Sequence, residues 1–139
     1  MQGLITSERA AKVYAFLARA GACPVEALAV MFGGEKKVQK AVRALTGAGY
    51  VRRVRVQGVE MAGLPGQDFS TERIALGWFA VRLAETGGIY DAETRKARFP
   101  SGHVLDVAVE ERGKVVKVGK FRVRLEKLRE NRLQEAIAS

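Results

Sequence analysis

The sequence is poor in the side chains that build reactive sites, because its 139 residues include one cysteine and one histidine. A lone thiol, Cys23, excludes an internal disulfide and a cysteine-based zinc site, and its segment GACPVE indicates a small apolar residue packed at a turn. His103 has no cysteine or acid at a spacing that forms a metal site or a catalytic triad. We expect this histidine at the surface or on an edge strand, and no cofactor is predicted.

Long apolar runs are also lacking, since none approaches the ~18 residues needed to span a bilayer. Residues 1–12 do not show the basic-then-apolar plan of a signal peptide. The glycine pairs at 33–34 and 87–88 lack the neighbouring Lys-Ser/Thr of a nucleotide-binding loop. The sequence therefore predicts a soluble, cytoplasmic protein that has no membrane partner.

Acidic residues are fewer than basic ones, 15 against 24, which gives a formal net charge of +9. Both halves contribute, because residues 1–69 hold ten basic and five acidic residues and residues 70–139 hold fourteen and ten. An apolar content of 47% is sufficient for a packed core. The chain has room for one ordinary domain or two small ones, and its charge indicates a polyanionic partner.

Acids are absent altogether between residues 36 and 55, a stretch that predicts a helix followed by a β-strand. Apolar residues recur there with the spacing of one helical face, at Val38, Ala41, Val42 and Leu45. Gly47 and Gly49 then supply a helix stop, and valines alternate with arginines in the strand that follows. The basic residues of this stretch are Lys36, Lys37, Lys40, Arg43, Arg52, Arg53 and Arg55.

The order of predicted elements around this stretch is helix, short helix, turn, basic helix and β-hairpin. Ser7 is a suitable N-cap for the first helix, which Gly21 ends, and Pro24 suits the first position of the second. The basic helix follows the Gly33–Gly34 turn, and the hairpin has strands at 50–56 and 59–64 around a Gln57–Gly58 turn. We expect Phe69 to close the hairpin sheet.

This order resembles the winged helix-turn-helix family over roughly residues 5–70, carried by PVEALAVMFGGEKKVQKAVRALTGAGYVRRVRV and the QG turn after it. The resemblance implies a DNA-binding domain at 1–70 whose third helix enters the major groove while the wing follows the backbone. It places Lys36, Lys37, Gln39, Lys40 and Arg43 on the helix against DNA, and Arg52, Arg53 and Arg55 on the wing. Gln39 would read adenine, and the cations would contact phosphates.

Two other interpretations of the basic face are open. An ordinary solvated helix also displays lysines, although such a face normally mixes charges of both signs. Winged helices can also bind protein alone, in which case the chain has no DNA affinity at modest salt. Charge alone does not separate RNA from DNA, but the chain lacks the aromatic-rich strands of common single-strand RNA modules. Double-stranded DNA is therefore the predicted partner.

The remaining residues, 71–139, predict a small α+β unit of helix, strand, hairpin and helix. The first helix, about 71–86, is apolar on more than one face, which predicts burial between the two halves or in a dimer seam, with Trp78 in the core. A strand at 89–99 follows, then a hairpin around Arg112–Gly113. A charged C-terminal helix is predicted from Arg122 to Ala138.

This second unit, joined to a winged helix, is similar to the replication-relaxation family of plasmids and other mobile elements. That resemblance implies a reduced restriction-endonuclease-like core of the PD-(D/E)xK type, in which two acids hold a divalent metal. Asp106 stands at the position of the first acid, but the acid-x-lysine triplet reads Val118–Gly119–Lys120. We expect a nuclease-like scaffold without nuclease activity. The rival is a metal-dependent nuclease or nicking accessory enzyme that uses Asp106.

A second basic segment begins just before the last predicted helix and continues into its first turn, at Lys120, Arg122 and Arg124, ahead of any acid in that helix. It predicts either a second DNA contact or a contact with an acidic partner or sister subunit. Together the sequence predicts an α+β, double-stranded-DNA-binding protein of a mobile element that acts in replication, transfer (conjugation) or transcription control. We expect a homodimer that recruits a replication or transfer protein.

Overall fold

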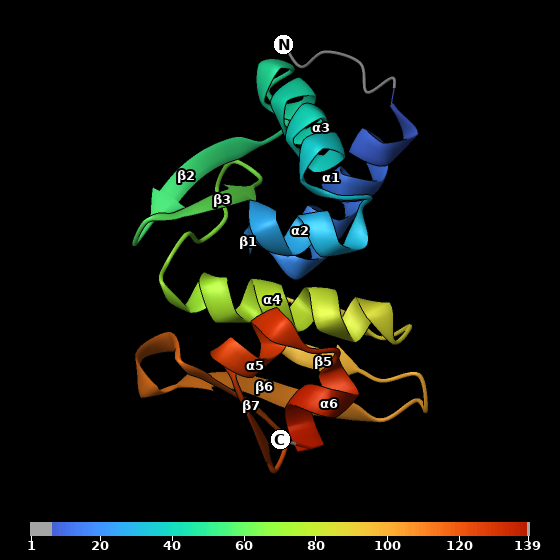
Figure 1. The fold of residues 1–139 in the computed structure, drawn as a ribbon, viewed down its shortest axis with the longest axis vertical. Helices are drawn as coiled ribbons and strands as arrows, with labels where there is room; N and C mark the ends of the chain where they lie inside the picture. Colours follow the sequence, from blue (N-terminus) through green and yellow to red (C-terminus); the bar gives the residue numbers. More distant parts are fainter. Residues whose placement is uncertain (1–6, 139) are drawn as a thin grey trace.

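In the computed structural model, which describes residues 7–138, the first helix begins where Ser7 caps it (Figure 1). The Ser7 hydroxyl accepts a hydrogen bond from the Ala10 N–H at 3.2 Å, so α1 (Glu8–Ala20) starts with a satisfied donor. The helix ends at Gly21, whose φ of +85° suits a residue without Cβ. The predicted first helix and its cap are confirmed.

The next two helices follow the predicted order with one shift. Pro24 lies in the short strand β1 (Cys23–Pro24) and serves as the N-cap of α2 (Val25–Met31), one residue before the predicted position. The basic helix is α3 (Glu35–Gly47), and its predicted apolar stripe is buried. That stripe fastens α3 to the first half of the chain and leaves its charged faces outside.

The hairpin consists of β2 (Arg52–Val56) and β3 (Val59–Gly63) around the predicted Gln57–Gly58 turn. Both turn residues have positive φ, 47° and 79°, as two-residue hairpin turns favour. Strand β3 also pairs with β1, so the sheet order is β1-β3-β2 and β2 lies at its edge. Phe69 is not part of this sheet; it lies in the connection that follows.

The second half contains a five-stranded antiparallel sheet in which each strand pairs with the next along the chain. Its strands are β4 (Ile89–Asp91), β5 (Lys96–Arg98), β6 (Val104–Glu110), β7 (Val115–Val118) and β8 (Phe121–Arg124). A short 3-10 turn, η1 (Glu111–Gly113), joins β6 to β7, so the hairpin predicted there is confirmed. The antiparallel order needs only tight connections.

Two predictions for this half are wrong. The strand expected at 89–99 is a hairpin, because the Asp91 carboxylate accepts the N–H groups of Glu93 and Thr94 at 2.9 and 3.3 Å and turns the chain. The helix expected from Arg122 to Ala138 begins later. Residues 121–124 pair with β7 as β8, and the rest forms α5 (Leu125–Glu130) and α6 (Leu133–Ala138). Asn131, in an extended conformation, separates these two helices.

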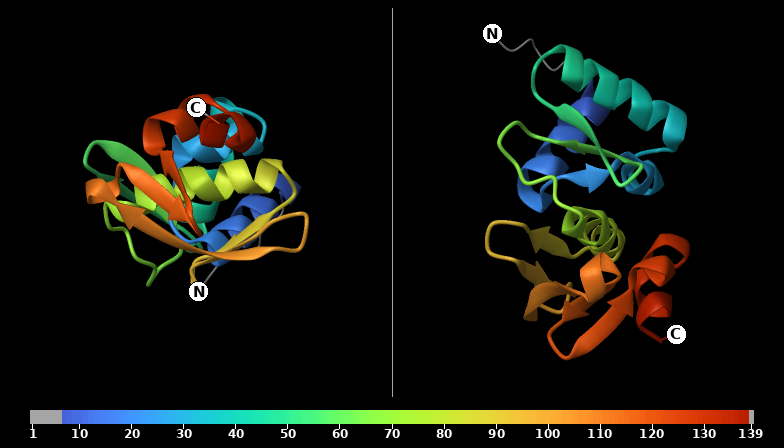
Figure 2. Two further views of the ribbon diagram at one scale, coloured as in Figure 1. Left: turned by 90° about the horizontal axis from the view of Figure 1, so that it is seen from below. Right: turned by 90° about the vertical axis from the view of Figure 1, so that its left-hand side faces the viewer.

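Helices cover one face of this sheet and leave the other open. The right-hand view in Figure 2 shows α5 and α6 on one side of the strands. Alternate strand residues are buried toward the helices, namely Tyr90, Ala97, Val107, Val116 and Val123. The residues of opposite parity are exposed or half-buried except Val115, which is buried; one solvated face is common for antiparallel sheets.

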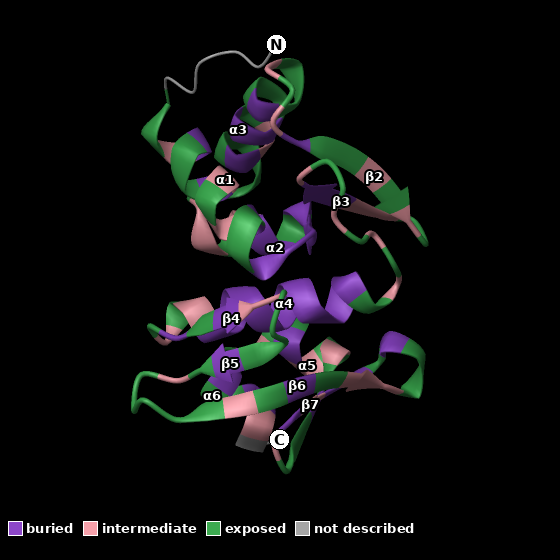
Figure 3. Ribbon diagram, turned by 180° about the vertical axis from the view of Figure 1, so that it is seen from behind, coloured by how far each residue is buried: buried purple, intermediate pink, exposed green. Residues whose placement is uncertain are grey.

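The apolar helix α4 (Glu72–Glu85) lies between the two halves and is buried along almost its whole length (Figure 3). It contacts α2 and β1 on one side and β4, β6, β7 and α5 on the other. Close approach is possible at Gly77, where a Cβ would lie 2.4 Å from Pro24 Cδ. The two alternatives for this helix are thus decided: it packs between the halves, and it does not offer a seam to a second copy.

Two buried arginines on α4 tie the halves to it. Arg73 donates from Nε and Nη2 to the Ala22 carbonyl at 3.2 and 3.1 Å, and from Nη2 to the Ala20 carbonyl. Arg82 donates from Nε to the Leu128 carbonyl at 2.6 Å and lies over the Trp78 ring. These guanidinium groups satisfy carbonyls at helix ends, which otherwise lack partners.

The mixed α+β class is confirmed, and one continuous hydrophobic core runs through both halves. The boundary predicted between residues 70 and 71 therefore falls in a connection between elements that share this core. Among the described residues, no helix has the length and apolar character needed to cross a membrane.

Candidate nucleic-acid interface

The exposed face of α3 carries four cations: Lys36, Lys37, Lys40 and Arg43. All four are exposed, because the apolar stripe occupies the opposite side of the helix. Within residues 7–138, none of them forms an ion pair with an acid. The structure therefore brings these predicted residues together as an uncompensated positive surface.

The β2–β3 hairpin lies beside α3 and adds two arginines on one face of the sheet. Arg53 and Arg55 share this face because strand residues alternate. The Arg53 guanidinium donates to Gln39 Oε1 on α3 at 2.9 Å, and Arg55 donates to the Gly58 carbonyl in the hairpin turn at 2.8 Å. Arg53 is thus held next to the helix, whereas Arg55 is held against the turn of its own hairpin.

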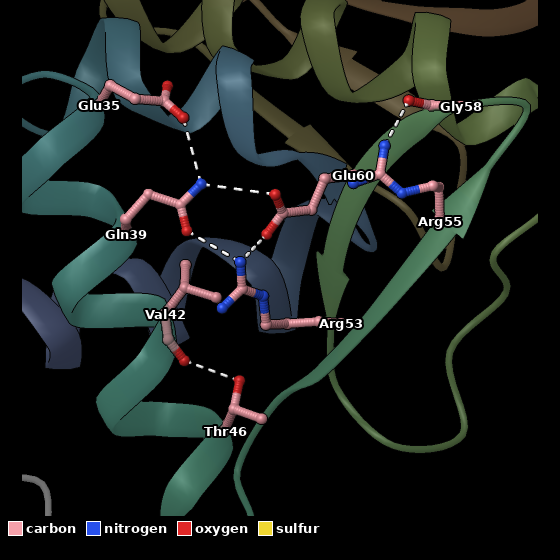
Figure 4. A network of polar contacts seen from close by, with 8 residues as sticks. All are labelled: Glu35, Gln39, Val42, Thr46, Arg53, Arg55, Gly58 and Glu60. Atoms are coloured by element: carbon pink, nitrogen blue, oxygen red, sulfur yellow. Dashed lines mark hydrogen bonds and ion pairs between the residues drawn. The ribbon is translucent and has the colours of Figure 1, made fainter.

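A polar network joins the helix to the hairpin (Figure 4). The Gln39 amide group donates to Glu35 at 3.1 Å and to Glu60 at 3.4 Å, while its oxygen accepts from Arg53. Arg53 also forms an ion pair with Glu60, and their side chains are 33% and 27% exposed. The network fixes the hairpin against α3.

This network changes what Gln39 can do. Its carboxamide is engaged at both ends within the protein, so a bidentate contact with adenine requires both ends to be released. The cations around it have no such restriction. We therefore assign Gln39 a linking role between helix and wing in place of the adenine contact expected from the sequence.

Arg52 is separated from the other wing arginines. Its guanidinium carbon lies 5.6 Å from the centre of the Phe69 ring, a cation–π contact. Alternation places it on the opposite face of β2 from Arg53. The sequence grouped the three arginines as one surface, and the structure divides them.

Glu60 is the functional residue that sequence reasoning missed. It lies directly across the hairpin from Arg55, a register that the two-residue turn at 57–58 fixes. Pairing the strand residues outward from that turn, Val56 with Val59 and then Arg55 with Glu60, would have placed this acid beside the arginines from the sequence alone. The stretch without acids from 36 to 55 is therefore partly neutralised in three dimensions.

The second predicted basic set lies far from this interface. Lys120 is in the β7–β8 turn and Arg122 and Arg124 lie on β8, at the opposite end of the long axis from α3 (Figure 1). Arg122 forms an ion pair with Glu110 at 2.9 Å. The structure thus forms two separate basic surfaces.

Asp106, the residue of the alternative nuclease reading, points to solvent. Its side chain is 83% exposed and pairs with Lys96 at 2.7 Å. Across residues 7–138, no three His, Cys, Asp or Glu side chains are grouped to hold a metal ion. The residues present do not fit a two-acid metal site.

The lone cysteine is buried and the lone histidine is exposed, as predicted, although Cys23 lies in the strand β1 and not at a turn. Cys23 is fully buried, and this burial raises the pKa of its thiol to about 12. His103 is exposed, and its ring Nδ1 lies 2.9 Å from the Ser101 hydroxyl.

No protein-family model matches the sequence, and no curated protein or solved structure shows significant similarity to it.

Proposed function

We propose that the chain binds double-stranded DNA as a winged helix-turn-helix protein. In this proposal α3 enters the major groove and the β2–β3 hairpin follows the adjacent backbone. The phosphates are contacted from the helix by Lys36, Lys37, Lys40 and Arg43, and from the hairpin by Arg53 and Arg55. Gln39 links the two elements.

The arrangement of elements supports this proposal. Three helices precede a hairpin, and the sheet order β1-β3-β2 places the hairpin at an edge beside α3. Such an order leaves one helix and one hairpin projecting from the same side of a small core. A rod and a ribbon with basic side chains fit a groove and its flanking phosphates.

A single observation carries the proposal: four exposed cations of α3 lack an acidic partner among the described residues. Solvated helices commonly display paired charges of both signs. An unpaired row of cations is costly through mutual repulsion unless an anion relieves it. Duplex DNA supplies such anions at about one charge per 1.7 Å of its axis.

The test is fluorescence anisotropy of a labelled random-sequence duplex at several salt concentrations. About five to six phosphate contacts should give a log–log salt slope near −5. The variant Lys37→Gln/Lys40→Gln should flatten this slope by about 2. A matched control, Lys12→Gln/Arg132→Gln, removes the same charge elsewhere and should leave the slope near its original value.

Absence of binding at low salt contradicts the proposal and favours a protein-interaction winged helix. The biological role we propose, at an origin or promoter of a mobile element, rests on the resemblance of the sequence to the replication-relaxation family. The proposal assigns no nuclease chemistry to Asp106. Homodimer formation is part of the proposal, with a seam other than α4.

A further inference from the structure

The open face of the second sheet carries cations that the proposed α3 interface does not use. On neighbouring strands, Lys117 lies directly opposite Arg122, and Arg124 follows two residues later on the same face. Lys120 occupies the turn between β7 and β8. We name these four residues, Lys117, Lys120, Arg122 and Arg124, the β7–β8 patch.

The patch contains a cross-strand pair of like charges, an arrangement that destabilises a sheet. The next residue in that row, Ala108 on β6, supplies no acid. The ion pair of Arg122 with Glu110 offsets part of the repulsion, but the two side chains are 65% and 34% exposed, so solvent screens it. Lys117, Lys120 and Arg124 have no acidic partner within residues 7–138.

No helix of the described chain covers this face, since α4, α5 and α6 pack on the other one. The patch also lies at the opposite end of the long axis from α3, with α4 between the two surfaces (Figures 1 and 2). A duplex in contact with α3 therefore leaves the patch free. The charge of the patch is complementary to a phosphate backbone.

We propose that the β7–β8 patch binds a second DNA duplex, so that one molecule bridges two DNA segments. This inference rests on the proposed function, which makes duplex DNA the polyanion that the chain meets. The patch contacts phosphates through cations on a flat sheet face. It therefore holds the second duplex without reading its sequence.

The experiment measures capture of one duplex by another. A biotinylated duplex is fixed on beads, protein is added below one molecule per duplex, and a fluorescent duplex of different sequence is supplied in solution. The patch variant is Lys117→Gln/Lys120→Gln/Arg124→Gln, which leaves the Arg122 ion pair in place. The matched control is Lys12→Gln/Arg19→Gln/Arg132→Gln, which removes the same charge from exposed sites outside both surfaces.

The wild type and the control should both capture the fluorescent duplex. The patch variant should hold the fixed duplex as the wild type does but capture about ten-fold less of the second. The single change Lys120→Glu, in an exposed turn, should also reduce capture. If the triple variant does not fold, the capture measured with Lys120→Glu tests the proposal in its place.

Two outcomes overturn the inference. Equal capture by the patch variant and the wild type means that two copies bridge through their α3 surfaces. No capture by the wild type, with normal binding to the fixed duplex, means that the patch serves an acidic protein or protects the sheet edge. Failure of the proposed function looks different, because Lys37→Gln/Lys40→Gln then leaves binding to the fixed duplex unchanged.

Discussion

Glu60 is an acid within a surface that we propose to bind DNA. If that surface binds phosphates, removing the charge of Glu60 should increase the affinity for DNA. The substitution Glu60→Gln keeps the shape of the side chain and removes one negative charge. Its carbonyl oxygen can still accept from Arg53. Because the Arg53–Glu60 pair is partly exposed, we expect the free energy of unfolding to fall by only about 0.5–1 kcal/mol.

The effect on DNA affinity should be in the opposite direction. A carboxylate about 7 Å from a phosphate repels it by about 0.6 kcal/mol in water, which alone corresponds to about a three-fold change in affinity. With Glu60 neutral, the proposed phosphate contact of Arg53 is no longer shared with a carboxylate, so the salt slope should become up to about 0.9 more negative. Together these effects should tighten binding about ten-fold at low salt.

The assay is the same anisotropy titration at several salt concentrations, with a thermal melt of each protein. Glu130→Gln, an exposed acid at the end of α5, is the matched control and should change affinity little. Weaker binding by Glu60→Gln with an unchanged melting temperature would refute the reasoning. In that case the carboxylate orients Arg53 for DNA instead of competing with it.

Three further predictions concern the packing that positions the two surfaces. Arg73→Ala removes a buried guanidinium that satisfies the carbonyls of Ala20, at the end of α1, and Ala22, so chemical denaturation should show a loss of about 3 kcal/mol. A loss below about 1 kcal/mol would contradict this. Gly77→Ala drives a methyl into Pro24 and should cost about 1–3 kcal/mol despite a better helix propensity; a higher melting temperature would show that β1 yields. Cys23 should react with a thiol reagent at pH 8 only on unfolding, because burial raises its pKa to about 12. Since the folded pKa lies above the unfolded one, this group also makes stability fall as pH rises above about 9, and fast labelling of the native protein would oppose both expectations.

The parts of the fold that the sequence predicted are those with local physical causes. The stripe from Val38 to Leu45 buries one side of α3 wherever the helix packs. The turn at Gln57–Gly58 requires positive φ, which sets the hairpin register. Each depends on residues close in the chain, and each is confirmed.

The wrong predictions arise where distant partners decide the structure. Residues 121–124 could continue a charged helix, but β7 offers them a strand partner, and pairing overrides their helix propensity. The Asp91 carboxylate accepts a backbone N–H two residues later and so forms a turn. The alternation of apolar and polar residues does not reveal such a turn. The contacts of Gln39 with Arg53 and Glu60 depend on how the hairpin packs against α3, which no local pattern specifies.

The position of α4 gives the proposed bridging a geometric consequence. Two domains on a flexible linker sample many orientations, so duplexes bound to them would lie at variable separations. Here α4 is packed by both halves, and Arg73 and Arg82 bind backbone carbonyls in the first and second half respectively. The α3 surface and the β7–β8 patch are therefore held at one mutual orientation. Bridged duplexes should accordingly lie at a single separation, whereas bridging by two α3 surfaces of a dimer would give a spacing set by the dimer seam.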